Sequence, residues 1–177
     1  RIVLVLAGYA RDDVTGTYIK LLKEKALRDE VDMIHIEDRV DHERRLEDGK
    51  KVYSLWDTYV ISDFVTYPSL WEGWGNQFLE ALRAKLPVMI FEYPVYTADI
   101  GAKGFDCVSL GAEDVREKDA KLAVVPEEVN SAAAAQAVKL LTDQVYRKQV
   151  VEKNFEIGKK YYSMHALREI LQGLMED

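Results

Sequence analysis

Two glutamates flank a glycine-containing stretch of the chain, and residues of these types at this spacing could bind a phosphate-bearing ligand that also carries hydroxyl groups. Glu72 opens the stretch Glu72-Gly73-Trp74-Gly75, and Glu80 follows after four further residues. Backbone amides in such a loop can bind an anion. Neither carboxylate lies where a phosphate would be favoured, so we expect both to face hydroxyl-bearing parts of the ligand.

The elements around this loop predict how it is positioned. The apolar run Phe64–Tyr67 predicts a buried strand, and Pro68 ends it. From Asn76 the pattern becomes helical, with Phe78 and Leu82 four residues apart. A strand, a glycine loop and a helix N-terminus in this order form an anion site, because free N–H groups and the helix dipole point into the loop. Whether the Asn76 side chain caps the helix or offers the ligand a hydrogen bond stays open.

The stretch P-S-L-W-E-G-W-G-N-Q-F-L-E-A resembles the donor-site motif of the retaining glycosyltransferases of family four, P-S-x-x-E-G-F/W-G-x-x-x-x-E-A. The resemblance implies that Glu72 is the catalytic residue, contacting sugar hydroxyls beside the reacting carbon, and that Glu80 holds the ribose. It implies that the diphosphate and the donor sugar are bound by the loop, namely by Gly73, Trp74, Gly75, Asn76 and Gln77. An ordinary strand–turn–helix with two surface carboxylates is the alternative.

The resemblance also implies a function for the chain as a whole. It predicts the carboxyl-terminal, donor-binding domain of a GT-B enzyme, which moves a hexose from a nucleoside diphosphate sugar to an unknown acceptor hydroxyl. The family's first strand–helix unit, with its diphosphate-neutralising arginine and lysine, and its amino-terminal acceptor domain have no counterpart here. We therefore expect a fragment of a longer protein that is inactive by itself. A Rossmann-like binding or interaction module without transferase activity is the alternative function.

Other chemistries receive less support from the residues. A glycoside hydrolase needs two carboxylates across one gap, and two glutamates separated by a loop and a helical turn need not face each other. No Asp-x-Asp element occurs and the three histidines are scattered, so we expect no metal and no cofactor other than the donor substrate. The second predicted strand, Val31–Ile36, ends where the family contacts the base through its backbone, which makes Ile36 and Glu37 candidate base contacts.

Length and composition limit the class of protein. The 177 residues are predicted to form one domain, residues 1–177, with 48% hydrophobic and 31% charged residues, typical of a soluble protein. A net charge of −7 disfavours nucleic acid or an anionic membrane surface as a partner. The single cysteine suits the reducing cytoplasm. No apolar run is long enough to span a membrane.

Strand-like and helical patterns alternate along the chain. Apolar runs predict strands at residues 2–6, 31–36, 64–67, 87–91 and 105–110, and a short extended piece at residues 122–125. Helical spacing is expected around Tyr18–Ala26, within the charged segment 41–62, and at residues 76–85 and 127–141. Two more helices are expected after Thr142, with a break at Tyr162-Ser163. This alternation predicts an α/β fold: a Rossmann-like parallel sheet with helices on both faces.

Overall fold

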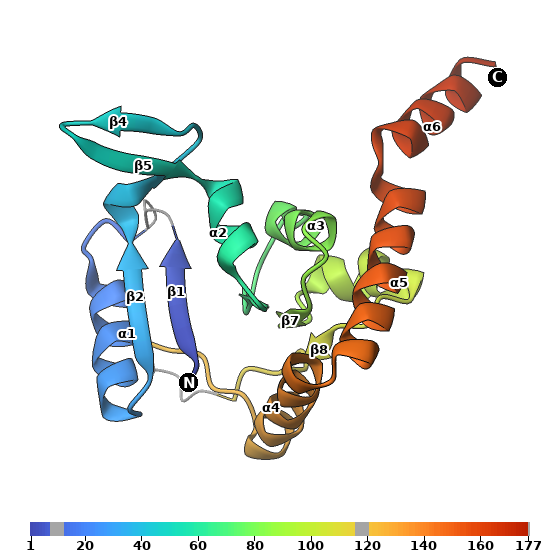
Figure 1. Cartoon of the computed structure of the whole chain (residues 1–177). Coiled ribbons are helices and arrows are strands. Elements are labelled where there is room, and N and C mark those ends of the chain that lie inside the picture. The colour runs from blue at the N-terminus through green and yellow to red at the C-terminus, as the bar shows by residue number, and fades with distance from the viewer. Residues whose placement is uncertain (8–12, 116–120, 177) are drawn as a thin grey trace. The chain divides into compact units, whose positions relative to one another are not determined.

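The computed structural model describes residues 1–7, 13–115 and 121–176. Strands and helices alternate along the chain, as predicted for an α/β protein (Figure 1). The elements in order are β1 (Val3–Ala7), α1 (Thr17–Arg28), β2 (Asp32–Ile36), the 3-10 turn η1 (Glu37–Arg39), β3 (Val40–Asp41), β4 (Arg45–Glu47), β5 (Lys50–Ser54), α2 (Leu55–Ile61), β6 (Val65–Tyr67), α3 (Asn76–Arg83), β7 (Val88–Ile90), η2 (Tyr96–Ile100), η3 (Gly101–Lys103), β8 (Val108–Ser109), α4 (Glu127–Thr142), α5 (Gln144–Tyr162) and α6 (Met164–Glu176).

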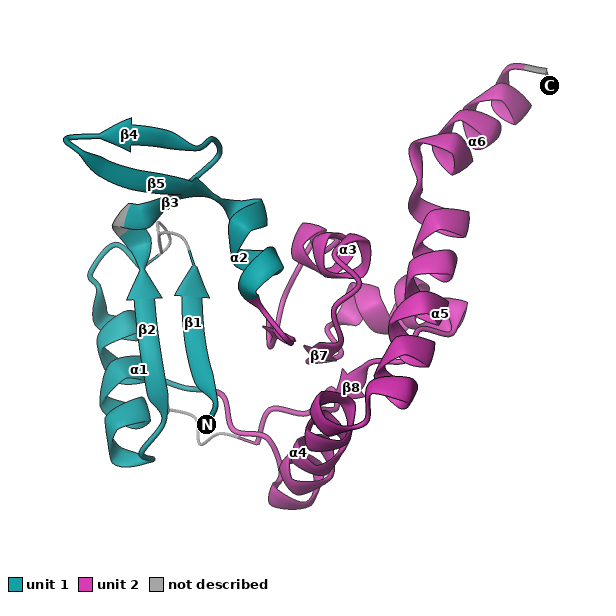
Figure 2. Ribbon diagram, in the orientation of Figure 1, with its two compact units in different colours: residues 1–61, 117–122 teal, residues 62–116, 123–177 magenta. Residues whose placement is uncertain are grey.

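The chain divides into two compact units (Figure 2). The assignment of residues 1–177 to one domain stays a prediction. Unit 1 comprises residues 1–61 with 117–122, and unit 2 comprises residues 62–116 with 123–177. Strand pairing within the described residues follows this division. Unit 1 contains the two-stranded sheet β1–β2 and the three-stranded sheet β3–β5–β4, and unit 2 contains the three-stranded sheet β6–β7–β8.

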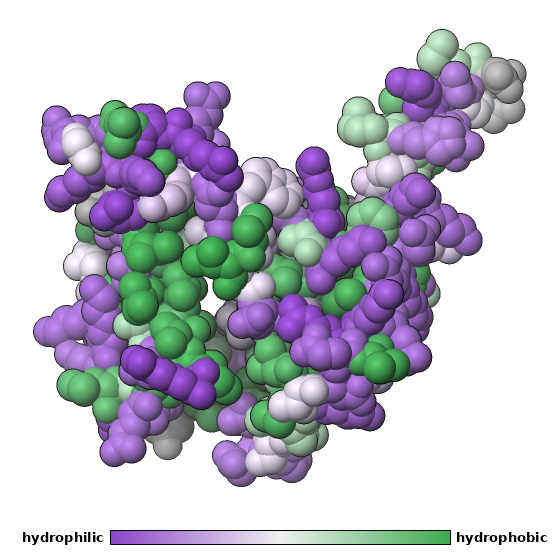
Figure 3. All heavy atoms as spheres, viewed as in Figure 1, coloured by the Kyte–Doolittle hydropathy of each residue, from purple (hydrophilic) through white to green (hydrophobic). Residues whose placement is uncertain are grey.

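Unit 1 is built on the parallel pair β1–β2, in which Val5 lies opposite Ile34. Burial alternates along β1 with the period of a strand, so that Leu4 and Leu6 are half-buried while Val3 and Val5 are exposed. Helix α1 packs against β2. Within this unit, one face of the pair is packed and the other presents apolar side chains, visible as green spheres in Figure 3.

The charged segment from Asp41 to Lys51 is a β-hairpin, so the prediction that it begins a helix is wrong. Strands β4 and β5 are antiparallel, with Glu47 opposite Lys50. The two residues between them, Asp48 and Gly49, have φ values of 49° and 76°. Positive φ at both positions defines the tight type I′ hairpin turn, for which Asp-Gly is a preferred sequence. Local turn chemistry therefore outweighs the helical spacing of this segment.

Helix α2 accordingly begins later than predicted, after the hairpin. Ser54 precedes the helix, and its backbone N–H and side-chain hydroxyl both donate to the Asp57 carboxylate, at 2.8 and 3.0 Å. Both hydrogen bonds run from Ser54 to Asp57, and they tie the residue before the helix to its first turn. Asp57 also pairs with Arg44, and this hydrogen bond lowers the pKa of the Asp57 carboxyl to about 2. Val52, predicted as the first apolar position of the helix, is instead a buried residue of β5.

Unit 2 contains the predicted parallel sheet, with β7 between β6 and β8. One cluster of its buried core consists of Phe91, Val108, Leu110, Ala133, Leu140 and Val150. Strand β8 is shorter than predicted, and no strand is assigned at residues 122–125. A backbone hydrogen bond joins that segment to the residues after β8: the Val124 carbonyl accepts from the Val115 amide at 2.9 Å.

The three carboxyl-terminal helices confirm the predicted pattern. Asp143 caps α5, accepting hydrogen bonds from the amides of Val145 and Tyr146. Ser163 caps α6 as expected, accepting from the Ala166 amide at 3.1 Å. Asn154 joins α5 to the segment before β8, because its amide group exchanges two hydrogen bonds with the backbone of Asp106. Asn154 is almost fully buried, so these bonds have no competition from water.

Candidate functional site

The predicted strand, loop and helix are all present in unit 2. Strand β6 pairs in parallel with β7, so that Tyr67 lies opposite Ile90. The chain leaves β6 at its carboxyl end, runs through the loop of residues 68–75, and enters α3 at Asn76. In parallel α/β sheets, ligands bind outside the carboxyl ends of the strands. The loop that carries Glu72 therefore lies at the edge where a ligand is expected.

Gly75 is the N-cap of α3, and its backbone explains why glycine occupies this position. Its φ is 100°, a conformation that other residues rarely adopt. A Cβ built on Gly75 would lie 2.4 Å from the Tyr93 hydroxyl and 3.3 Å from the Tyr67 hydroxyl. The turn into the helix therefore requires both the freedom and the small size of glycine. Gly73, in contrast, has open space around its Cα.

The amino-terminal end of α3 has the properties of an anion site. Among the described residues, no side chain caps this helix. Asn76 is the first helical residue rather than the cap, which removes the capping alternative for its side chain. Asn76 and Gln77 are exposed, while Phe78 is fully buried. The first amides of a helix lack intrahelical partners, so the amides at Asn76 and Gln77 are placed to bind an anion together with the dipole of α3.

Tyr93 holds the loop in position. It follows β7, is fully buried, and donates a hydrogen bond from its hydroxyl to the Trp74 carbonyl at 2.8 Å. Burial, followed by the negative charge of Glu72, raises the pKa of the Tyr93 hydroxyl to about 12. The hydroxyl therefore stays protonated and keeps donating well above neutral pH. The Trp74 indole adds a second anchor, since it packs edge-on against Tyr162 of α5 with ring centroids 4.7 Å apart.

Tyr67 places a buried hydroxyl beside the loop. Its side chain is 6% exposed and packs edge-on against Tyr93. Within the described residues, the Tyr67 hydroxyl has no partner that meets hydrogen-bond geometry. Burial raises the pKa of this hydroxyl, and the carboxylate of Glu72 raises it further, so Glu72 lies close enough to act on it electrostatically. An unsatisfied buried donor costs free energy, and the group is available for a ligand or for a reoriented Glu72.

The two glutamates are held differently. Glu72 is a half-buried loop residue near the hydroxyls of Tyr67 and Tyr93. Glu80 is a half-buried residue one turn into α3, a helix whose buried face consists of Phe78, Ala81 and Leu82. The predicted residues Glu72 to Glu80 thus lie in the loop after β6 and in the first part of α3. The division of their roles between sugar and ribose stays a prediction.

The candidate base contacts belong to unit 1. Ile36 is the last residue of β2 and is half-buried, and Glu37 opens the 3-10 turn η1 and is exposed. Both lie at the carboxyl end of their strand, as the sequence analysis expected. Their contact with a base stays a prediction.

Sequence reasoning missed Tyr67 and Tyr93. Each stands at or just beyond the carboxyl end of one of two adjacent parallel strands, β6 and β7. Because such ends meet at one edge of the sheet, this shared position is the signal that could have identified them. Their hydroxyls surround Gly75 and fix the conformation of the motif.

Metal-binding clusters and membrane-spanning helices are both absent from the described residues. No group of three or more His, Cys, Asp or Glu side chains there could hold a metal ion. No helix in the described part of the chain has the length and apolar character needed to cross a membrane.

Comparisons with known proteins agree with the motif. The chain is 38% identical to the mannosylglucosylglycerate synthase of Thermotoga maritima over 170 residues, which cover 96% of the chain and 37% of that protein. It is 45% identical to the mannosylglucosylglycerate synthase of Petrotoga mobilis over 120 residues, 66% of the chain and 26% of that protein. The chain thus spans well under half the length of these curated relatives. No protein-family model matches it.

The fold is shared with a solved structure. The crystal structure of TarM superimposes with a TM-score of 0.54 at 16% identity, covering 99% of this chain and 28% of TarM. This similarity concerns the fold, whereas the relatives from Thermotoga maritima and Petrotoga mobilis show the similarity in sequence. The chain is thus similar in sequence to a segment of these two synthases and similar in fold to part of TarM.

Proposed function

We propose that this chain is the donor-binding part of a retaining glycosyltransferase, which moves a hexose from a nucleoside diphosphate sugar to an acceptor hydroxyl. The observation that carries the proposal is the N-terminus of α3. It begins at a glycine that two tyrosine hydroxyls surround, and it lies directly after Glu72 and before Glu80. The two curated relatives are named for a product that contains mannosyl and glucosyl units, which favours a hexose as the transferred sugar.

In this proposal the loop stabilises the leaving group. Sugar transfer separates a diphosphate anion from a sugar carbon that gains positive charge. Backbone amides of Trp74, Gly75, Asn76 and Gln77 donate to the diphosphate, assisted by the dipole of α3. Tyr93 is a positioning residue here, because its hydrogen bond to the Trp74 carbonyl fixes the loop before the ligand arrives. Fixed donors need no reorganisation during the reaction, which is the source of their effect.

The carboxylates act on the hydroxyl-bearing parts of the donor. Glu72 supports positive charge at the reacting carbon and orients the sugar, and Glu80 accepts hydrogen bonds from the ribose. The buried Tyr67 hydroxyl gains a partner when a sugar oxygen or a reoriented Glu72 comes within reach. We assign no metal to this chemistry, and we place the protein in the cytoplasm because its single cysteine fits a reducing compartment.

The acceptor side is assigned to protein outside this chain. The relatives are much longer than the matched segment, and a GT-B active site lies between two domains. Catalysis by positioning needs both reactants at near-attack distance. We therefore propose that an amino-terminal domain of the same protein binds the acceptor.

Calorimetry with a panel of uridine, guanosine and adenosine diphosphate sugars tests the proposal. We expect one of these ligands to bind, and to bind more tightly than the corresponding nucleoside monophosphate, because the loop amides contact the diphosphate. We expect the same affinity with and without a chelator. Binding that disappears with chelator would contradict the metal-free assignment. Equal affinity for the monophosphate and the diphosphate sugar would contradict the role of the loop.

A further inference from the structure

A buried hydroxyl without a hydrogen-bond partner stands at the start of the motif loop. Tyr67 is the last residue of β6, and its side chain is 6% exposed. Among the described residues, none offers its hydroxyl a partner in hydrogen-bond geometry. Such groups are few in native proteins, and a catalytic or binding role is one reason for which they persist. The Tyr67 hydroxyl is therefore a candidate for a role in the site.

The fold fixes the position of this hydroxyl. The Tyr67 ring packs edge-on against the fully buried ring of Tyr93, with ring centroids 6.1 Å apart. Its backbone belongs to the sheet, where Tyr67 lies opposite the fully buried Ile90. The Tyr67 carbonyl also accepts a hydrogen bond from the Phe91 amide at 3.3 Å. The ring therefore cannot turn away from the loop without disturbing the core.

The motif loop begins and ends beside Tyr67. Its first residue follows Tyr67 directly, and a Cβ built on Gly75, at its end, would lie 3.3 Å from the Tyr67 hydroxyl. Glu72 is half-buried in the middle of this loop. Burial raises the pKa of the Tyr67 hydroxyl most, Glu72 raises it further, and Ser69 lowers it. Glu72 is thus a negatively charged neighbour of the unpaired hydroxyl.

The protons of the two tyrosine hydroxyls differ in availability. A tyrosine hydroxyl has one proton to donate, and Tyr93 donates its proton to the Trp74 carbonyl at 2.8 Å. The Tyr67 proton has no such acceptor among the described residues. A carboxylate has two oxygens that together accept about four hydrogen bonds. Glu72 can therefore accept one bond from Tyr67 and still accept bonds from ligand hydroxyls.

We propose that Tyr67 is a positioning residue for Glu72. Its hydroxyl donates to one oxygen of the Glu72 carboxylate when the donor binds, and the other oxygen then faces the hydroxyls of the transferred sugar. The inference rests on the proposed function, in which Glu72 contacts that sugar. Hydrogen bonds to a charged acceptor are short and strong, so this contact fixes the carboxylate for the sugar. It gives the site a preference for sugar-bearing nucleotides over free ones.

Calorimetry with uridine and guanosine diphosphates, and with their glucose and mannose derivatives, tests the role of the hydroxyl. Tyr67→Phe should weaken the sugar-bearing ligand about tenfold, the effect of losing one hydrogen bond to a charged group. It should leave the affinity for the free diphosphate unchanged. Tyr146→Phe is the matched control for binding, because Tyr146 is a half-buried tyrosine of α5 beside the core cluster, and it should bind both ligands normally.

Urea unfolding tests whether the hydroxyl is unpaired before the donor binds. Tyr67→Phe should raise the urea midpoint, because it removes a buried donor that has no acceptor. Tyr162→Phe is the control for stability, since the Tyr162 hydroxyl is also buried without a partner in the described part of the chain, and it should shift the midpoint in the same direction. A lower midpoint for Tyr67→Phe would show an existing hydrogen bond and overturn the inference.

A double-mutant cycle identifies the partner of Tyr67. In a Glu72→Ala background, adding Tyr67→Phe should cause no further loss of affinity for the sugar-bearing ligand. An undiminished further loss would show that Tyr67 contacts the ligand directly, and equal losses for the free and sugar-bearing diphosphates in Tyr67→Phe would show a general effect on the loop. Either result would overturn the inference.

The same measurements separate the inference from the proposed function. If a nucleoside diphosphate sugar binds and Glu80→Ala weakens it, while Tyr67→Phe changes nothing, the positioning role fails and the proposed function stands. If the wild-type chain binds none of the nucleoside diphosphate sugars, both fail.

Discussion

Replacement of Gly75 by alanine should destabilise unit 2 more than a glycine replacement elsewhere. The new Cβ would lie 2.4 Å from the Tyr93 hydroxyl, and Tyr93 is fully buried, so its ring cannot swing away. A residue other than glycine at this φ costs about 1–2 kcal/mol, and overpacking costs about 1–3 kcal/mol. Together these effects predict a loss of about 2–5 kcal/mol in the free energy of unfolding.

Gly104→Ala is the matched control. Gly104 has a φ of 88°, and a Cβ added there would meet nothing within 4 Å, so only the backbone cost of about 1–2 kcal/mol applies. Urea unfolding followed by tryptophan fluorescence compares the variants. Adding Tyr93→Phe to Gly75→Ala removes the clashing oxygen, and the two changes should couple favourably by about 1–3 kcal/mol. Equal destabilisation by Gly75→Ala and Gly104→Ala, or the absence of coupling to Tyr93→Phe, would refute the reasoning.

Three further predictions concern stability and activity. Asn154→Ala removes two hydrogen bonds between a buried amide side chain and the backbone of Asp106, and should cost about 1–3 kcal/mol in urea unfolding, whereas exposed Asn130→Ala should change it by less than about 0.5 kcal/mol. The Tyr93 pKa is raised from 10.0 to about 12, so its contribution to stability is complete below pH 10 and is lost as pH rises towards 12; a pH series of unfolding curves should show this loss, and Tyr93→Phe should reduce it. The chain alone should transfer no sugar across a broad acceptor panel, because it supplies one side of the site; transfer by the chain alone that Glu72→Ala abolishes would contradict this.

The sequence predicted the elements that depend on hydrophobic period and on strong local signals. The run from Phe64 to Tyr67, the helix from Asn76 and the Ser163 cap all appear in the structure. The hairpin at Asp48-Gly49 replaces the helix predicted from the dense charge of this segment, because the turn signal dominates when both residues adopt positive φ.

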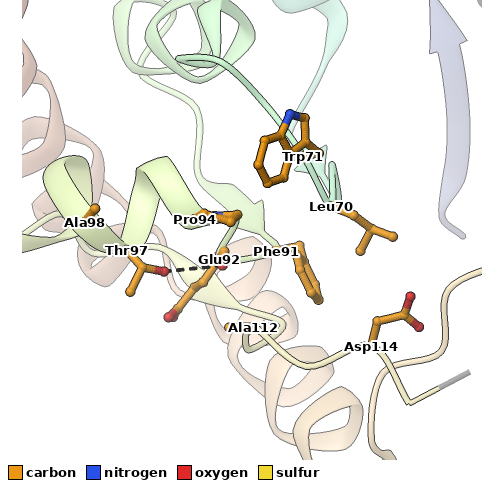
Figure 4. A pocket seen from close by; sticks show the side chains of 9 residues that line it. All are labelled: Leu70, Trp71, Phe91, Glu92, Pro94, Thr97, Ala98, Ala112 and Asp114. Carbon is orange, nitrogen blue, oxygen red and sulfur yellow. Dashed lines mark hydrogen bonds between the residues drawn. The ribbon is translucent and has the colours of Figure 1, made fainter.

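Only the part of the candidate site that is contiguous in the sequence was predicted. The motif predicted a glycine loop between Glu72 and Glu80 and a helix N-terminus, and these are present. Tyr93 and its hydrogen bond to Trp74 join residues that are far apart in the sequence, so only the pairing of β6 with β7 brings them together. A pocket lined by Trp71, Phe91 and Ala112, among others (Figure 4), depends likewise on three separate strand ends. Contacts of this kind follow from sheet topology, which periodicity does not specify.

The division of labour between the two glutamates is the most direct test of the account. Calorimetry should compare a free nucleoside diphosphate with its sugar, using the wild-type chain, Glu72→Ala, Glu80→Ala and the exposed control Glu128→Ala. We predict that Glu80→Ala weakens both ligands by about 1.5–3 kcal/mol, the value of a hydrogen bond to a charged group. Glu72→Ala should weaken only the sugar-bearing ligand, and Glu128→Ala neither. Equal losses for both ligands in both glutamate variants would contradict the account.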